Sequence, residues 1–135
     1  MGRGRRSLAR ETAMQMLFQM DAQTDFSPEA MEDYLRKYLE DASQRGFIVS
    51  IYEHVRDNLE TIDAAIERSS DNWRTARMAR VDLTILRIAA AEVMFMDNIP
   101  ASVSANEAVD LAKIFGGDDS SKFVNGILGK LIGTR

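Results

Sequence analysis

The chain has 135 residues, with 45% hydrophobic and 28% charged side chains, which suits one globular domain. It contains no cysteine and one histidine, so a disulfide framework, a thiolate nucleophile and a zinc finger are excluded. The net charge is −4, yet residues 1–10 hold four arginines and no acid, whereas residues 21–72 hold 13 acids and five bases. Such a basic N-terminal arm on an acidic body suggests contact with a polyanion; an arm that only improves solubility is the alternative, and charge alone favours it.

Apolar residues recur at helical spacing from Leu8 to Ile132, without the alternation typical of strands. A first helix is expected from about Ser7, a candidate N-cap. A second begins at Ser27-Pro28, where a capping serine precedes a proline at the first helical position. The expected buried stripes of these two helices are Ala9, Ala13, Met16, Leu17 and Met20, then Met31, Tyr34, Leu35, Tyr38, Leu39 and Ala42.

The rest of the chain continues the helical pattern. After a break at Gly46, residues 48–66 predict one or two helices with a bend near Thr61, and residues 69–72 predict a loop. Residues 81–96 form the most apolar segment, so a central position is expected. Two further helices follow, separated by Gly116-Gly117. Their expected inner residues are Val109, Leu111, Ala112, Ile114 and Phe115, then Val124, Ile127, Leu128 and Leu131. The pattern predicts an all-α bundle of six to seven helices.

Signals for an enzyme or a membrane protein are weak. No apolar run approaches the roughly 20 residues of a membrane helix, and the N-terminus lacks the apolar core of a secretory signal, so we expect a cytoplasmic protein. His54 lies on the polar side of its helix, and adjacent carboxylates on a helix point about 100° apart, so neither predicts catalysis. No enzyme activity, cofactor or metal is expected.

Two aromatic residues fall off the buried stripes. Phe18 lies on the outer side of the first helix, and Phe123 lies at the rim of the last helix beside Lys122. An exposed ring near cations suits single-stranded RNA, because stacking of a base on it contributes about 1–3 kcal/mol. Packing of both rings against neighbouring helices is the alternative, and the pattern alone favours it slightly.

Several strings in order resemble the NusB family of bacterial transcription antitermination factors. They are Arg5-Arg6, Ala9-Arg10-Glu11 and Leu17-Phe18, then residues 81–89 with Glu92, and finally Ile99-Pro100, Asn106-Glu107-Ala108, Leu111-Ala112-Lys113, Phe115-Gly116 and residues 123–128. Each string is short, but together they span nearly the whole chain. The resemblance implies two packed helical subdomains in a single NusB-like RNA-binding domain over residues 1–135, with a flexible basic arm at 1–7.

The resemblance also implies a role. Proteins of this family pair with NusE, a small-subunit ribosomal protein, and bind the boxA element of nascent ribosomal RNA leaders in the transcription elongation complex. The RNA contacts carried over are Arg3, Arg5, Arg6, Arg10, Phe18, Asp119, Lys122 and Phe123. Asp82 matches a position that faces NusE, whereas helix capping explains Asp119 equally well. Arg87 lies inside the apolar segment, so we expect it to pair with an acid such as Glu92 or Glu107.

Two other functions stay open at this point. The acidic body could dock a basic protein, which would make the chain a scaffold without RNA. It could also resemble the domain that precedes some RNA methyltransferases, although no room for a methyl-donor domain is expected before Arg135. Monomer and homodimer fit the composition equally well.

Overall fold

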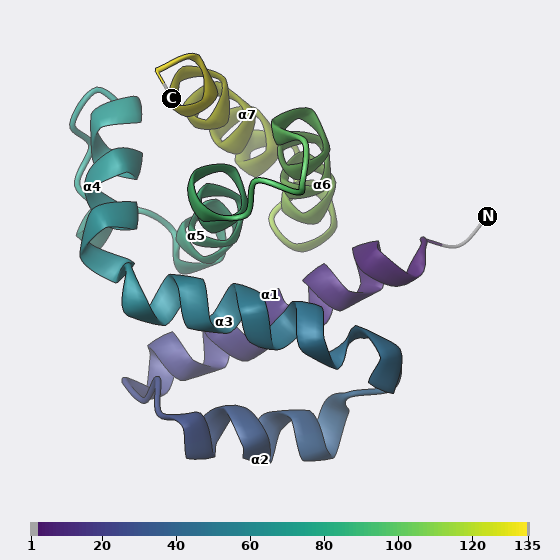
Figure 1. Cartoon of the computed structure of the whole chain (residues 1–135). Coiled ribbons are helices and arrows are strands. Elements are labelled where there is room, and N and C mark those ends of the chain that lie inside the picture. Colours follow the sequence, from purple (N-terminus) through teal and green to yellow (C-terminus); the bar gives the residue numbers. More distant parts are fainter. Residues whose placement is uncertain (1–2, 135) are drawn as a thin grey trace.

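The computed structural model describes residues 3–134, which form seven α-helices and two 3₁₀ turns without any strand (Figure 1). The helices are α1 (Arg5–Gln23), α2 (Pro28–Tyr38), α3 (Arg45–Asp57), α4 (Leu59–Ser69), α5 (Arg80–Phe95), α6 (Ala101–Phe115) and α7 (Asp118–Gly133). The 3₁₀ turns are η1 (Ala42–Gln44) and η2 (Thr75–Arg77). The predicted all-α bundle is therefore confirmed, with seven helices.

Helix α5 is the centre of the fold, as its composition predicted. It packs against α1 and α3 on one side and against α4, α6 and α7 on the other, so it joins two groups of helices (Figure 1). Every residue from 82 to 93 is buried. Each fully buried Leu or Ile contributes about 1.5–3 kcal/mol, so this helix supplies much of the stability.

Helix starts follow local capping chemistry where the chain offers it. The Ser27 hydroxyl accepts a hydrogen bond from the N–H of Ala30 at 3.1 Å, and Pro28 occupies the first helical position, which confirms the predicted start of α2. Helix α1 begins at Arg5, two residues before the expected Ser7, because the Ser7 hydroxyl donates to Glu107 of α6 and does not cap the helix.

The expected basic arm is thus shorter in the structure than in the sequence analysis. Residues 5–7 form the first turn of α1, and only residues 3 and 4 of the described chain precede it. The part of the expected arm at residues 1–2 lies outside the described residues, as does residue 135.

Several local expectations were wrong. Gly46 lies inside α3, and the break before that helix is the 39–44 segment that contains η1. Tyr38 and Ile114 are 55% and 50% exposed, not buried. Tyr38 is the last residue of α2 and borders an open groove, and Ile114 points about 100° from the face of α6 that packs on the core. Ala42 is exposed in η1.

None of the helices within residues 3–134 is long and apolar enough to cross a membrane.

Candidate functional site

The first turn of α1 displays two free arginines. The Arg5 side chain is 78% exposed, with Nε 3.8 Å from Asp41 Oδ2. The guanidinium of Arg6 lies 4.0 Å above the Phe47 ring, and this cation–π contact holds its head group on the surface. Phe47 itself is buried, so the ring is a fixed support. These two cations can meet an anion without breaking any strong pair.

Arg3 is less available. Its side chain is 25% exposed, with Nε 3.2 Å from Glu11 and Nη2 3.3 Å from Glu107. Neither Arg3 Nε nor Glu11 Oε2 has a hydrogen-bond partner among the described residues, so that contact is an ion pair without a well-aligned hydrogen bond. Arg3 therefore sits between the surface and the core, restrained by two acids.

Arg10 departs from the implied RNA contacts, because it lies in the core. It is 3% exposed and donates from Nε and Nη2 to the two carboxylate oxygens of Glu92, at 2.8 and 2.9 Å. Ser104 donates to the same carboxylate at 2.8 Å, and Glu107 lies 3.6 Å from Arg10 Nη1. This arrangement satisfies a buried charge, which could not reach a phosphate without being unpaired. The expected RNA contact of Arg10 is therefore wrong, and Arg10 has a structural role.

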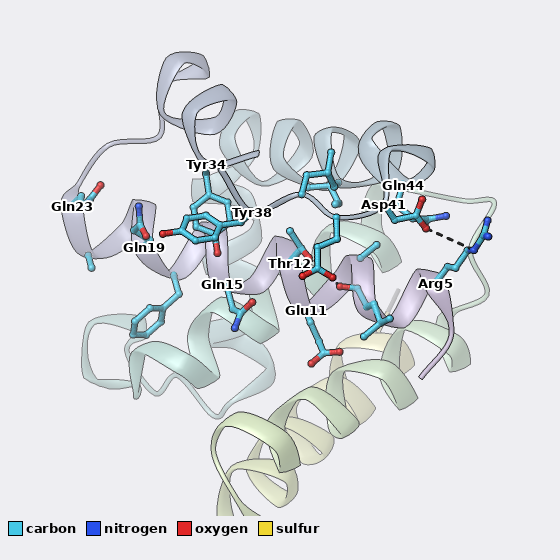
Figure 2. A pocket seen from close by; sticks show the side chains of 17 residues that line it. Arg5, Glu11, Thr12, Gln15, Gln19, Gln23, Tyr34, Tyr38, Asp41 and Gln44 are labelled. Atoms are coloured by element: carbon cyan, nitrogen blue, oxygen red, sulfur yellow. Dashed lines mark hydrogen bonds and ion pairs between the residues drawn. The ribbon is translucent and has the colours of Figure 1, made fainter. Parts of the chain in front are cut away.

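A groove of about 740 Å³ runs along the outer face of α1 (Figure 2). One wall is α1, whose lining residues recur every three or four positions, and the other is α2 with the segment that follows it. The α1 lining residues on this repeat are Arg5, Leu8, Thr12, Gln15, Gln19 and Gln23, and Phe18 also borders the groove. Arg5 and Asp41 lie at one end and Gln23 at the other (Figure 2).

The middle of the groove is polar but mostly uncharged. Tyr34 and Tyr38 of α2 have ring centroids 4.6 Å apart and face the side of α1 that carries Gln15 and Gln19 (Figure 2). Amide side chains both donate and accept hydrogen bonds, and tyrosine rings offer flat apolar faces. The sequence did not predict this site, because the helical pattern placed both tyrosines on the buried stripe. The four-residue repeat of glutamines at 15, 19 and 23 was the available signal.

Arg5 and Asp41 lie together at one end of the groove (Figure 2). Glu11 and Glu40 also line it, and Arg5 is the one cation among the described lining residues. A hydrogen bond from the Ser43 hydroxyl lowers the pKa of the Asp41 carboxyl below its usual value, and the backbone N–H of Ser43 and the charge of Arg5 act in the same direction against desolvation. Asp41 is therefore ionised at neutral pH and shields part of the Arg5 charge.

Phe18 is 37% exposed, so its ring is neither free nor enclosed. Its exposed part borders the groove, and Phe18 is not among the side chains that pack on the core. Thirteen residues of helix separate it from Arg5, which corresponds to about 20 Å along α1. The structure thus places one predicted cation and one predicted ring along a single groove.

The predicted residues at the start of α7 do not line this groove. Asp119 and Lys122 are exposed, whereas Phe123 is half-buried and packs on the core. The N-cap of α7 is Gly117, whose φ of +92° favours glycine, and no side chain caps the helix. The capping explanation for Asp119 is therefore wrong, although an acid in the first turn still complements the helix dipole.

Asp82, the expected contact for NusE, is also largely covered. It lies in the first turn of α5 and is 8% exposed. Its Oδ1 atom is buried without a hydrogen-bond partner among the described residues. Only a small part of the Asp82 side chain can therefore meet a partner.

Arg87 is structural, as predicted, but its partners differ from those expected. It donates to both Asp63 oxygens at 2.9 and 2.8 Å and to Asp21 at 3.3 Å. Burial alone would lower the pKa of the guanidinium, but the hydrogen bonds and charges of the two aspartates outweigh it, and the net pKa is raised. Glu92 was unavailable because Arg10 occupies it.

The sequence profile of the NusB family matches residues 7–133 of the chain. The chain belongs to the NusB family. It is 44% identical to the transcription antitermination protein NusB of Alkaliphilus oremlandii, over 94% of this chain and 92% of that protein. It is 46% identical to the protein of the same name from Bacillus licheniformis, over 94% of this chain and 95% of that one.

Solved structures of the family share the fold. The T. maritima NusB structure superposes with a TM-score of 0.85 at 30% identity and covers 98% of this chain and 93% of its own. A NusB chain solved with NusE and double-stranded RNA superposes with a TM-score of 0.86, covering 96% and 97% of the two chains. At 24% identity, that second likeness concerns the fold alone.

Proposed function

We propose that this chain is a transcription antitermination factor that acts by binding single-stranded RNA and catalyses no reaction. The observation that carries the proposal is the groove on α1, which has the exposed Arg5 at one end and the Phe18 ring on its border. Membership of the NusB family supports the same role, because the curated relatives bear the name of transcription antitermination proteins. The proposed location is the cytoplasm, where transcripts are made.

In the proposed binding mode, different side-chain types contact different parts of the RNA. Arg5 and Arg6 contact phosphates, with Arg3 a weaker contributor because two acids hold it. Phe18 stacks on a base, which contributes about 1–3 kcal/mol. Lys122, Phe123 and Asp119 at the start of α7 form a second proposed contact outside the groove. Arg10 supports the surface from within, by fixing α1 on α5.

The proposed RNA is a boxA-type element of a nascent ribosomal RNA leader, and the proposed protein partner is NusE within the transcription elongation complex. A NusB of the same fold has been solved with NusE and double-stranded RNA, which motivates the choice of NusE and of RNA as partners. Asp82 stays the predicted NusE contact, through the small part of its side chain that is exposed. We include the whole chain, residues 1–135, as the single proposed binding domain.

Fluorescence anisotropy with a labelled boxA-type single strand, with and without NusE, tests the proposal. We expect binding that weakens as salt rises and that NusE strengthens. No binding at low salt in either condition would reject the proposal. Light scattering of the same samples decides between a monomer and a homodimer.

A protein scaffold is the second candidate, favoured by the 13 acids against five bases in residues 21–72. It predicts that NusE binds with equal affinity whether or not RNA is present, and that RNA alone does not bind. The anisotropy experiment therefore separates the two functions directly.

A further inference from the structure

A second exposed ring lies outside the site described above. Trp73 is the only tryptophan of the chain and is 54% exposed in the segment between α4 and α5. Residues 72–81 around it contain three arginines and no acid, and Arg68 lies just before them. The preceding fifty residues are strongly acidic, so this segment is a local reversal of charge. We call Trp73 with Arg68, Arg74, Arg77 and Arg80 the tryptophan patch.

The turn that carries Trp73 is built from specific hydrogen bonds. Asp71 and Asn72 adopt left-handed φ values of 56° and 64°, which these residue types tolerate better than most. The Ser70 hydroxyl lies within hydrogen-bond distance of the carbonyls of Glu67 and Trp73, at 3.0 and 3.2 Å. The N–H of Thr75 donates to Glu67 Oε2 at 2.8 Å. The backbone on both sides of Trp73 is therefore held in place, and its indole is displayed on an ordered turn.

Arg68, Arg74 and Arg77 of the patch have head groups without a close ion pair, whereas Arg80 pairs with Asp21. The N–H of Arg77 donates to the carbonyl of Arg74 at 2.9 Å, so one tight turn joins the two residues. The Arg74 side chain is 78% exposed, and its ion pair with Glu67 is loose, with Nε 3.9 Å from Oε2. Arg68 and Arg77 form no ion pair within residues 3–134 and are exposed. Arg68, Arg74 and Arg77 can therefore bind an anion without giving up a close ion pair.

The patch is continuous with the Phe18 end of α1. Arg80 donates from Nη1 to Asp21 at 3.3 Å and from Nη2 to the carbonyl of Thr75 at 3.1 Å. Asp21 lies three residues after Phe18, so the two side chains are neighbours on one face of α1. Arg80 thus connects the border of the groove with the turn that carries Trp73.

We propose that a single-stranded RNA in contact with Phe18 continues over Arg80, Arg77 and Arg74 and stacks a base on Trp73. This inference rests on the proposed function and extends its site. A flat ring among cations suits an unpaired base and its phosphates. The immediate neighbours of Trp73 are Asn72 and Arg74, without the apolar surround that the core of a protein interface needs. An acidic protein segment is therefore the weaker match.

The single tryptophan makes the test direct, because its fluorescence reports only on this position. Two unlabelled strands of the same base composition are titrated, one of about 5 and one of about 12 nucleotides. We expect both to bind in anisotropy competition, but only the longer strand to quench Trp73. Trp73→Ala should weaken binding of the longer strand about five-fold or more, while the shorter strand is unaffected. Trp73→Phe should retain most of the affinity because it keeps a flat ring.

Matched variants separate this site from general charge loss. Arg74→Ala with Arg77→Ala should reduce both the quench and the salt dependence for the longer strand. Arg36→Ala on α2, whose side chain is 69% exposed, removes one surface charge elsewhere and should change neither. Melting temperatures check that every variant is folded.

The outcomes distinguish failure of this inference from failure of the proposed function. If the longer strand binds without quenching Trp73 and Trp73→Ala leaves its affinity unchanged, the tryptophan patch is not an RNA site, and the α1 site still stands. If neither strand binds at low salt, the proposed function fails and this inference fails with it. A quench by poly-glutamate but by neither strand would overturn the inference in favour of an acidic protein partner.

Discussion

Arginines on the inner and outer faces of α1 have opposite environments, one buried and one exposed. On the inner face, Arg10 is buried between α5 and α6, where Glu92, Ser104 and Glu107 surround it. On the outer face, Arg5 is exposed at the end of a groove. The two arginines are five positions apart in the sequence. The comparison teaches that an arginine-rich string does not define a binding surface until the helix that carries it is packed.

The difference follows from the cost of burying charge. A guanidinium taken out of water loses several kcal/mol of solvation, and only close, well-aligned acceptors offset that loss. Arg10 has such acceptors on both sides, so its charge is fully committed inside the fold. Arg5 keeps its solvation and has one loose contact with Asp41, so it is available to a ligand. Four predictions test this contrast between the two faces.

The largest effect is expected on the inner face. Arg10→Ala should destabilise the protein by about 3–5 kcal/mol, because it leaves the Glu92 carboxylate buried and unpaired. Urea unfolding followed by circular dichroism measures this loss. Arg10→Met combined with Glu92→Met should recover much of the stability, since it removes both charges. If Arg10→Ala were as stable as the wild type but no longer bound RNA, Arg10 would be an RNA contact and not a structural residue.

Phe18→Ala should act mainly on RNA binding. We expect the affinity for a boxA-type strand to fall about five-fold or more, with a stability loss of about 1 kcal/mol because part of the ring is already exposed. Anisotropy and thermal melting measure the two effects on the same sample. A stability loss of about 3 kcal/mol or more would place the ring in the core and remove it from the interface.

Arg5→Ala with Arg6→Ala should flatten the salt dependence of RNA binding. Each lost phosphate contact removes about 0.7 from the slope for a single strand, so the pair should remove about 1.4. Stability should change by no more than about 1 kcal/mol, the usual strength of the exposed contact between Arg6 and Phe47. An unchanged slope would show that these two arginines do not contact phosphates.

The smallest effect is expected at Asp41, the acid beside Arg5. Asp41→Asn should strengthen RNA binding by about two-fold at low salt and have no effect at high salt, because exposed charges are screened. Since the hydrogen bond from Ser43 lowers the pKa of Asp41, its contribution to stability is present above the usual pKa and is lost as pH falls through the lowered value. Wild-type and Asp41→Asn affinities should therefore keep a constant ratio between about pH 5 and 8.

Much of the fold could be predicted because its signals are local. The cap and proline at Ser27-Pro28 depend on neighbouring residues alone, and the start of α2 agrees. The mostly apolar residues 82–93 predicted a central position for α5, and all of them are buried. Likewise, helical geometry alone placed Phe18 off the buried stripe, and its partial exposure agrees with that position.

The pairing of charges could not be predicted, since it depends on which helices meet. Arg87 was expected to pair with Glu92 or Glu107. In the structure Glu92 pairs with Arg10, and Arg87 pairs with Asp63 and Asp21. The groove was missed for the same reason, because it brings together residues of α1, α2 and the segment after α2. The arginines around Trp73 are close in the sequence, but neither Tyr38 nor Trp73 carries a local signal that distinguishes an exposed ring from a buried one.

The order of amino acids was thus sufficient to predict six to seven helices around a central apolar one, and to place this chain in the NusB family, because helical periodicity and short motifs depend on residues only a few turns apart. Packing alone decided which arginine stabilises the core and which faces solvent. The reason is physical: the free energy of a charged or aromatic side chain depends on its surroundings, and those surroundings come from helices distant in the chain.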